Sequence, residues 1–78
     1  KVAEMAHDGL ARVIRPVHTM YDGDTVFALS TGQVSLPGDK ASAISAVGEL
    51  AASAMEIAII RGVKNACKLN SIPSANSI

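Results

Sequence analysis

The chain has 78 residues, and its seven Lys and Arg balance seven Asp and Glu, so the net charge is zero. This length, roughly half that of a usual domain, excludes a multi-domain enzyme, and the balanced charge removes the positive surface that a nucleic-acid-binding protein needs. Hydrophobic residues make up 49% of the chain, which excludes a disordered protein.

A chain of this size needs more than its own core to be stable. Below about 80 residues a single core seldom supplies more than about 3 to 5 kcal/mol, and disulfides, metals or partners supply the rest. Cys67 is the only cysteine, which excludes an intramolecular disulfide and a cysteine-based zinc cluster. The composition therefore predicts a partner chain, and the free cysteine fits a reducing cytoplasm, where we expect the protein to be located.

The first expected element is a helix over residues 2–14. Arg12 lies four residues after Asp8, an acid-base pair that is typical of a solvated helix face. Pro16 disfavours helical geometry in the residue before it, so the helix should end at about Ile14. Unlike a signal peptide, this segment carries charges from its first turn. Its apolar residues have helical spacing and form one stripe, made of Val2, Met5, Ala6, Leu10, Val13 and Ile14.

Residues 17–31 are expected to be extended. Residues 17–20 precede a strong turn signal at residues 21–24, and residues 25–31 are rich in strand formers. Near the centre of the second strand apolar side chains fall on both faces, as in a sheet that is covered on both sides. Two strands alone are marginal in water, so the remaining strands of the sheet should come from residues outside this chain.

A long helix is expected over residues 40–66, after a loop at residues 32–38. Asp39 suits the N-cap position of this helix. Three large apolar residues lie away from its small-residue face, which predicts that the helix is buried in a larger assembly: Leu50, Ile57 and Ile60. The small-residue face would let another helix or a sheet come close, and consists of Ile44, Val47, Gly48, Ala51, Ala54, Met55, Ala58, Ile59, Gly62 and Val63.

The long helix also raises the question of a membrane, because residues 41–60 approach the length of a spanning segment. Glu49 and Glu56 interrupt this stretch, and its small residues are weakly lipophilic. We therefore interpret it as a soluble helix and expect no membrane partner. We assign residues 1–69 to one domain and residues 70–78, which are polar and rich in turn formers, to a loosely ordered tail.

Reactive side chains are densest at residues 18–25. Asp22 and Asp24, separated by one glycine, can shift each other's pKa, hold a metal or pair with a cation. Asp-Gly-Asp is also ordinary turn chemistry. The residues after Asp24 lack the oxygen ligands of a calcium loop, and a metal site made of His18, Asp22 and Asp24 stays as an alternative.

The other reactive residues are interpreted as structural. His7 falls beside the solvated face of the first helix and should be a surface residue. His18 is either a core histidine or a site residue. Cys67 is expected to be a small buried hydrophobe rather than a nucleophile. Arg12 and Arg15 are expected to be solvated or to bridge elements.

Residues 6–32, AHDGLARVIRPVHTMYDGDTVFALSTG, resemble the C-terminal part of the P1 peptidase family. This family includes L-aminopeptidase/D-amidase-esterases, beta-aminopeptidases and nylon-oligomer hydrolases. The long helix fits the closing helix of the family in character only, and residues 67–78 are not covered. The resemblance implies an α/β (α+β) fold, in which this chain is a helix, strand and long-helix fragment of a four-layer alpha-beta-beta-alpha sandwich without a cofactor.

The resemblance also implies a mechanism. Family members are made as a precursor that cuts itself into a large alpha chain and a small beta chain, whose first Ser or Thr is the nucleophile. We expect that nucleophile just upstream of Lys1. By resemblance, Asp22 and Asp24 flank it, and Asp24 is the stronger candidate. They would orient and tune its α-amine, whose usual pKa is about 8, so that the amine acts as the base.

These expectations describe the beta chain of a self-cleaving amidohydrolase or aminopeptidase that acts on short peptides or amides. Alone the chain should be inactive. Its expected partners are the larger alpha chain and further alpha-beta units in a homo-oligomer, and no substrate-binding residue is identified. One alternative is a hydrolase of non-peptide amides, such as an aminohexanoate oligomer or a pantetheine-like substrate. Another is a non-catalytic helix-strand-helix module that oligomerises through its alanine-rich helix.

Overall fold

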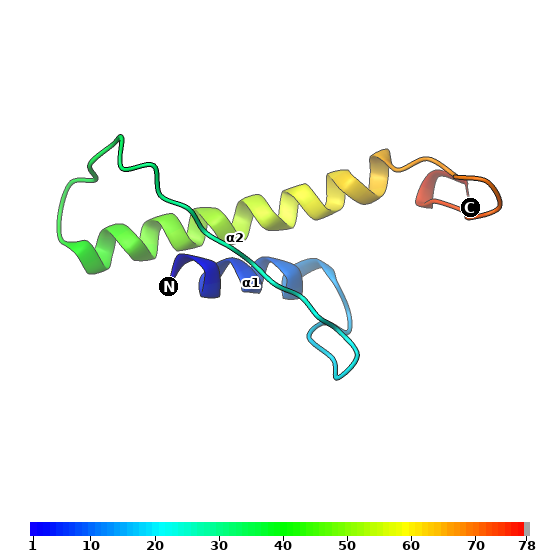
Figure 1. Ribbon diagram of the computed structural model, residues 1–78, viewed down its shortest axis with the longest axis horizontal. Coiled ribbons are helices and arrows are strands. Elements are labelled where there is room, and N and C mark those ends of the chain that lie inside the picture. Colours follow the sequence, from blue (N-terminus) through cyan, green and yellow to red (C-terminus); the bar gives the residue numbers. More distant parts are fainter. Residues whose placement is uncertain (78) are drawn as a thin grey trace.

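The structure is a computed structural model and describes residues 1–77. It consists of helix α1 (Val2–Val13), helix α2 (Lys40–Asn65) and a short 3-10 helix η1 (Ala75–Ser77). The two α-helices lie side by side, while the connecting residues 14–39 loop away from α1 and return across the pair (Figure 1). The protein is elongated, with dimensions of 51 × 28 × 18 Å.

Both expected helices are present, nearly with their expected ends. α1 stops at Val13, and Ile14 is already extended, with φ −120° and ψ 126°, in agreement with the restriction that Pro16 places on the chain. α2 ends at Asn65, one residue before the expected end, and begins after Asp39 as expected. The side chain of Asp39 accepts hydrogen bonds from the backbone N–H of Ser42 at 2.8 Å and from its hydroxyl at 2.9 Å.

The N-cap of α2 gives a pH-dependent prediction. The two hydrogen bonds from Ser42 favour the charged carboxylate and lower the pKa of Asp39 below its ordinary value of 3.8. A group whose pKa is lowered by folding stabilises the helix at pH values above its ordinary pKa. The stabilisation is lost as the pH falls through the lowered pKa. A 13C titration of the Asp39 carboxyl carbon in the full-length protein should give a midpoint below 3.8; a midpoint at or above that value would contradict the cap.

The two helices meet through residues that are small or lack a side chain. The buried residues are Ala6 and Gly9 of α1, and Gly48 and Ala52 of α2. A methyl group on Gly9 would meet the carbonyl oxygen of Ala52 and would lie 2.7 Å from Cβ of Met55. Such a close approach is available only to glycine. The small-residue face expected for α2 is confirmed in part: Gly48 is buried in the contact, but the other buried residue, Ala52, was not assigned to that face, and Ala54, Ala58 and Gly62 of the face are exposed.

Arg12 joins the two helices at their partly exposed edge. Its guanidinium lies 3.3 Å from the Glu49 carboxylate and 3.6 Å from the Glu56 carboxylate, both on α2. The bridging role expected for Arg12 is therefore confirmed, and the expected pairing with Asp8 is wrong. A guanidinium offers several donors in a planar fork, so it can serve two carboxylates across the helix pair at once.

The expected strands at residues 17–20 and 25–31 do not form, so this part of the prediction is wrong for the chain described. Within residues 1–77 no strand is present, and the only β-type pairing is an isolated bridge between Leu69 and Ile72. A strand requires a neighbour that pairs with its backbone groups. Among the residues that the structure describes, no second segment pairs with residues 25–31, and Phe27 and Leu29 are 91% and 93% exposed. The described residues therefore form a pair of packed helices and do not test the expected sandwich.

α2 is long and apolar enough to cross a membrane by length and composition, a test that the core helix of a soluble protein also passes. Within the described residues α2 is not covered on most sides, so its expected burial in a larger assembly stays a prediction. Leu50 is 70% exposed, and Ile57 and Val63 are also exposed. Two acidic residues within this helix hold the guanidinium of Arg12.

The end of the chain folds back on the end of α2. The side-chain amide of Asn76 donates hydrogen bonds to the carbonyl groups of Lys64 and Ala66, which satisfies acceptors at the end of the helix. Cys67 is exposed rather than buried as expected, because it follows the helix end. Ile78, the last residue of the predicted tail, lies outside the described residues.

Candidate functional site

Asp22 closes a tight turn between α1 and the extended segment. Its carboxylate accepts a hydrogen bond from the backbone N–H of Thr19 at 3.0 Å, and its own N–H donates to the carbonyl of Thr19 at 3.1 Å. The backbone N–H of Tyr21 donates to the Thr19 hydroxyl at 3.3 Å. The turn is therefore held by local side-chain to backbone bonds of the kind that make Asp common in turns.

This turn keeps the Asp22 carboxyl ionised. The hydrogen bond from the Thr19 backbone lowers the pKa of Asp22 below its ordinary value, the Thr19 side chain acts in the same direction, and the nearby His18 contributes least. A carboxylate that accepts such bonds favours its charged form. One of the two predicted site residues is thus a fixed negative charge at neutral pH.

Asp24 has a different partner. Its carboxylate lies 3.4 Å from Nδ1 of His18, at ion-pair distance whenever the imidazole is protonated. Both side chains are about one-third exposed, 34% for Asp24 and 40% for His18. The hydroxyl of the next residue, Thr25, donates to the carbonyl of Gly23 at 3.3 Å. Asp22 and Asp24 therefore lie in one turn, each held by a different residue of the preceding bend.

His7 of α1 also reaches this cluster, which the sequence did not indicate. The centres of the His7 and His18 rings are 5.1 Å apart, and the ring planes are inclined by 55°. His7 was expected at the surface and is half-buried. No spacing rule relates residues 7 and 18, because the contact depends on how the chain reverses after α1. The site is thus anchored to a helix as well as to its own turn.

The alternative metal site is not assembled. Within residues 1–77 no group of three or more His, Cys, Asp and Glu side chains is arranged to hold a metal ion. Asp22 is engaged by the Thr19 backbone, whereas Asp24 faces His18. His18 is exposed, so the structure places it with the site residues rather than in the core.

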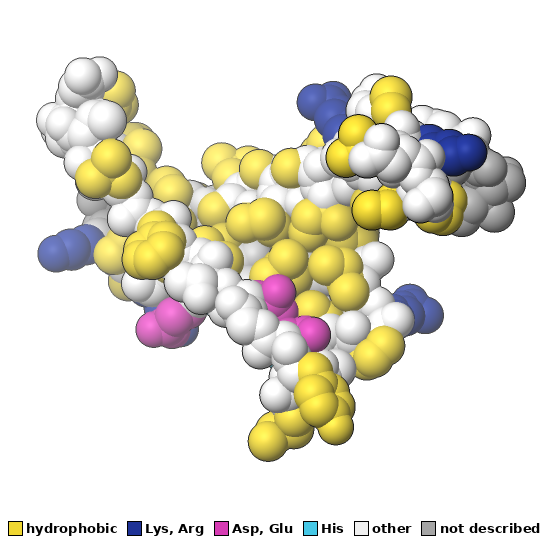
Figure 2. Space-filling view, turned by 45° about the vertical axis from the view of Figure 1, so that its right-hand side comes forward, with side chains coloured by type: hydrophobic (Ala, Val, Ile, Leu, Met, Phe, Trp, Pro, Cys, Tyr) yellow, Lys and Arg dark blue, Asp and Glu magenta, His cyan; other side chains and the backbone are white. Residues whose placement is uncertain are grey.

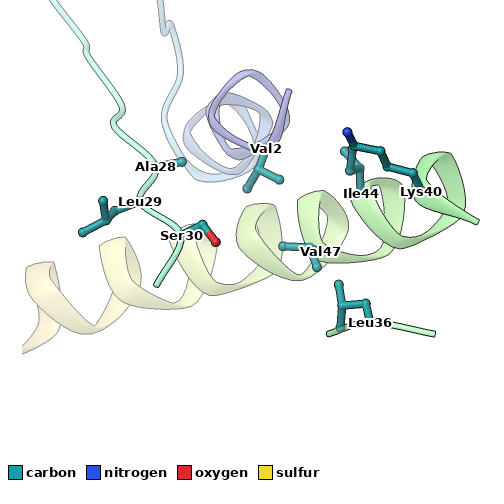
Figure 3. Close-up of a pocket in the computed structure, with 8 residues that line it drawn as sticks. All are labelled: Val2, Ala28, Leu29, Ser30, Leu36, Lys40, Ile44 and Val47. Carbon is teal, nitrogen blue, oxygen red and sulfur yellow. The ribbon is translucent and has the colours of Figure 1, made fainter. Parts of the chain in front are cut away.

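Beyond the turn, the extended segment passes over an apolar surface of the helix pair. Hydrophobic side chains cover the middle of the face shown in Figure 2, and acidic side chains lie beside them. A cavity of about 580 Å³ opens between residues 28–30 and the first turns of the helices (Figure 3). A second cavity of about 350 Å³ lies between residues 26–28 and both helices. The lining of the first includes Val2, Leu29, Leu36, Ile44 and Val47.

The comparisons with known proteins decide the family. The sequence profile of peptidase family S58 matches residues 1–75, which is nearly the whole chain. The chain belongs to peptidase family S58. The resemblance to the P1 peptidases is confirmed by this match, and the S58 match extends beyond residues 6–32 through both helices. The comparison with solved structures gave no match.

Relatives with curated names are bacterial. An uncharacterized aminopeptidase of Mycobacterium tuberculosis is 45% identical over 83 aligned positions, which cover 95% of this chain and 24% of that protein. An uncharacterized aminopeptidase of Mycobacterium leprae is 71% identical over 34 residues, 44% of this chain and 9% of its own. A 6-aminohexanoate-oligomer endohydrolase of Kocuria sp. is 33% identical over 69 residues, 80% of this chain and 19% of its own. The S58 chain described here spans about a quarter of the length of the first of these relatives.

Proposed function

We propose that this chain is part of the small beta chain of a self-cleaving N-terminal-nucleophile amidohydrolase or aminopeptidase that acts on short peptides or amides. Its nucleophile would be a Ser or Thr just upstream of Lys1. The observation that carries the proposal is the Asp-Gly-Asp turn within a match to a peptidase family over residues 1–75. The relatives named as aminopeptidases support the same class of reaction.

In this proposal Asp24 and Asp22 act on the α-amine of the nucleophilic residue. The amine takes the proton of the attacking hydroxyl, so a positive charge develops on it in the transition state. A nearby carboxylate stabilises that charge and fixes the position of the amine. Asp24 is the better candidate, because the carboxylate of Asp22 is engaged by the backbone of Thr19.

The remaining parts of the enzyme would come from outside this chain. The larger alpha chain of the same precursor would complete the sheet, the oxyanion-binding groups and the substrate pocket. The exposed apolar residues of the extended segment and of α2 support such a partner, because large apolar side chains are normally covered in a finished fold. A homo-oligomer of alpha-beta units in the bacterial cytoplasm is part of the same proposal.

A second candidate is hydrolysis of a non-peptide amide. It is favoured by the relative from Kocuria sp., which is named a 6-aminohexanoate-oligomer endohydrolase. The two candidates share the nucleophile and the acidic turn, and they differ in the pocket. Parallel assays of the purified full-length protein with short peptide amides and with 6-aminohexanoate oligomers distinguish them by which substrate has the higher kcat/KM.

Intact-mass spectrometry of the full-length protein under denaturing conditions tests the self-cleavage. We expect two polypeptides whose masses add up to that of the precursor plus one water molecule, with the smaller one beginning at a Ser or Thr upstream of Lys1. Replacing that residue by Ala should leave one uncut chain. A single uncut wild-type polypeptide that still hydrolyses amides would contradict the proposal.

A further inference from the structure

We infer that His18 is a positioning residue for Asp24, and that His7 supports it from α1. The inference deepens the proposed function and rests on it, because it concerns the carboxylate that would stabilise the nucleophile's amine. It assigns a role to the two histidines, which neither the turn motif nor the family match explains.

The geometry of the bend carries the first step. His18 has a left-handed backbone, with φ 56°, a conformation that is uncommon for residues other than glycine and in which Asn, Asp and His are enriched. This conformation belongs to the reversal between α1 and the Asp-Gly-Asp turn. From it, Nδ1 of His18 reaches the Asp24 carboxylate at 3.4 Å.

The second step is the support behind the imidazole. A carboxylate that is about one-third exposed and held only by another loop residue would sample several rotamers, and its position would be poorly defined. The His18 ring lies 5.1 Å from the His7 ring, and His7 is in the second turn of α1. Asp24 therefore contacts His18, and His18 contacts His7, so the site carboxylate is connected to helix α1.

The two acids of the turn are thus held in separate ways. Asp22 is fixed by the backbone N–H of Thr19, a donor that every residue except proline keeps at position 19. Asp24 depends on the side chain of residue 18. We therefore expect substitution of His18 to lower the rates of self-cleavage and turnover through its effect on Asp24. The stability of the fold should not account for the loss.

Two variants of His18 separate the effect of its backbone conformation from the effect of its side chain. Both Gly and Asn accept a positive φ, but only Asn offers an N–H close to the position of Nδ1. In the full-length precursor we expect His18→Gly to slow self-cleavage and to lower kcat of the processed enzyme about tenfold, because misplacement of a catalytic group by about 1 Å can cost up to about 100-fold in rate. His18→Asn should restore both rates to within about threefold, and KM should change little in either variant.

The double variant shows whether the two residues act together. If His18 acts through Asp24, His18→Gly combined with Asp24→Asn should be no slower than Asp24→Asn alone. The melting temperature of each variant, measured in parallel, identifies any loss of folding.

The outcomes distinguish this inference from the proposed function. A His18→Gly variant that works at the wild-type rate, beside an impaired Asp24→Asn variant, would overturn the positioning role and leave the proposed site intact. Equal losses in His18→Gly and His18→Asn, with a lower melting temperature, would reduce His18 to a structural residue and also overturn it. An Asp24→Asn variant with normal processing and turnover would remove the site assignment, and the role of His18 with it.

Discussion

Asp24→Asn in the full-length precursor should lower self-cleavage and the turnover of the processed enzyme about 100-fold, the usual size of an effect on a group that assists proton transfer. Asparagine keeps the shape of the side chain but has no charge, so the positive charge that develops on the amine loses its counter-charge. Folding should be preserved, because Asp24 is exposed and its contact is with one side chain. Intact-mass spectrometry over time and a steady-state amide assay provide the two readouts.

Two further acid-to-amide changes serve as comparisons. Asp22→Asn should have a smaller effect, because an amide oxygen can still accept the hydrogen bond from the Thr19 backbone. Asp8→Asn is the matched control, since it makes the same change on the exposed face of α1. Wild-type cleavage and turnover in Asp24→Asn would withdraw Asp24 from the site, and an equal loss in Asp8→Asn would show that net charge rather than position is responsible.

Gly9→Ala should destabilise the protein by about 1 to 2 kcal/mol, because about 2 to 3 kcal/mol of overpacking outweighs the gain of about 1 kcal/mol in helix propensity. The new methyl group would meet the carbonyl of Ala52 and Cβ of Met55. Neither atom belongs to the far end of a flexible side chain, so the helices themselves must move apart. Urea unfolding of the full-length protein measures the change.

The same substitution at two other glycines gives graded controls. Gly62→Ala places its methyl group in open space and should stabilise by about 1 kcal/mol through propensity alone. Gly48→Ala would meet the sulfur and terminal methyl group of Met5, which can move away in another rotamer, and would lie 3.0 Å from its Cβ, which cannot. We therefore expect a change in stability between those of Gly9→Ala and Gly62→Ala. A Gly9→Ala variant as stable as Gly62→Ala would mean that α1 and α2 do not pack in this way.

Sequence reasoning predicted the helices well because their signals are local. A proline three residues after the end of α1 and an Asp that caps α2 each act over a few positions. Hydrophobic spacing identified Ala6 and Gly48 as packing residues, but not Gly9 and Ala52, the other two buried residues. A bridging role was one of the two expected for Arg12, but its partners on α2 were not predicted. An intrahelical pair with Asp8 and a bridge to α2 fit the same spacing, and only the placement of the second helix chooses between them.

For the extended segment, by contrast, the prediction from sequence was wrong. Residues 25–31 have strong strand propensity, yet a strand exists only with a neighbour, and propensity does not supply one. The same limit applies to the site. The two acids were found because they form a motif within three residues, whereas the contact of His7 with His18 depends on a chain reversal. Side chains that come together through tertiary structure leave no periodic signal.

The exposed segment also decides how this protein should be produced. From residue 25 to residue 38 the chain carries no charge, and its large apolar side chains are open to solvent. An uncharged stretch of strand-forming residues without a neighbour is a template for aggregation between copies. The isolated 78-residue polypeptide should therefore precipitate on concentration. In the proposed precursor, synthesis as one polypeptide with the alpha chain would offer the segment a partner before it meets a second copy.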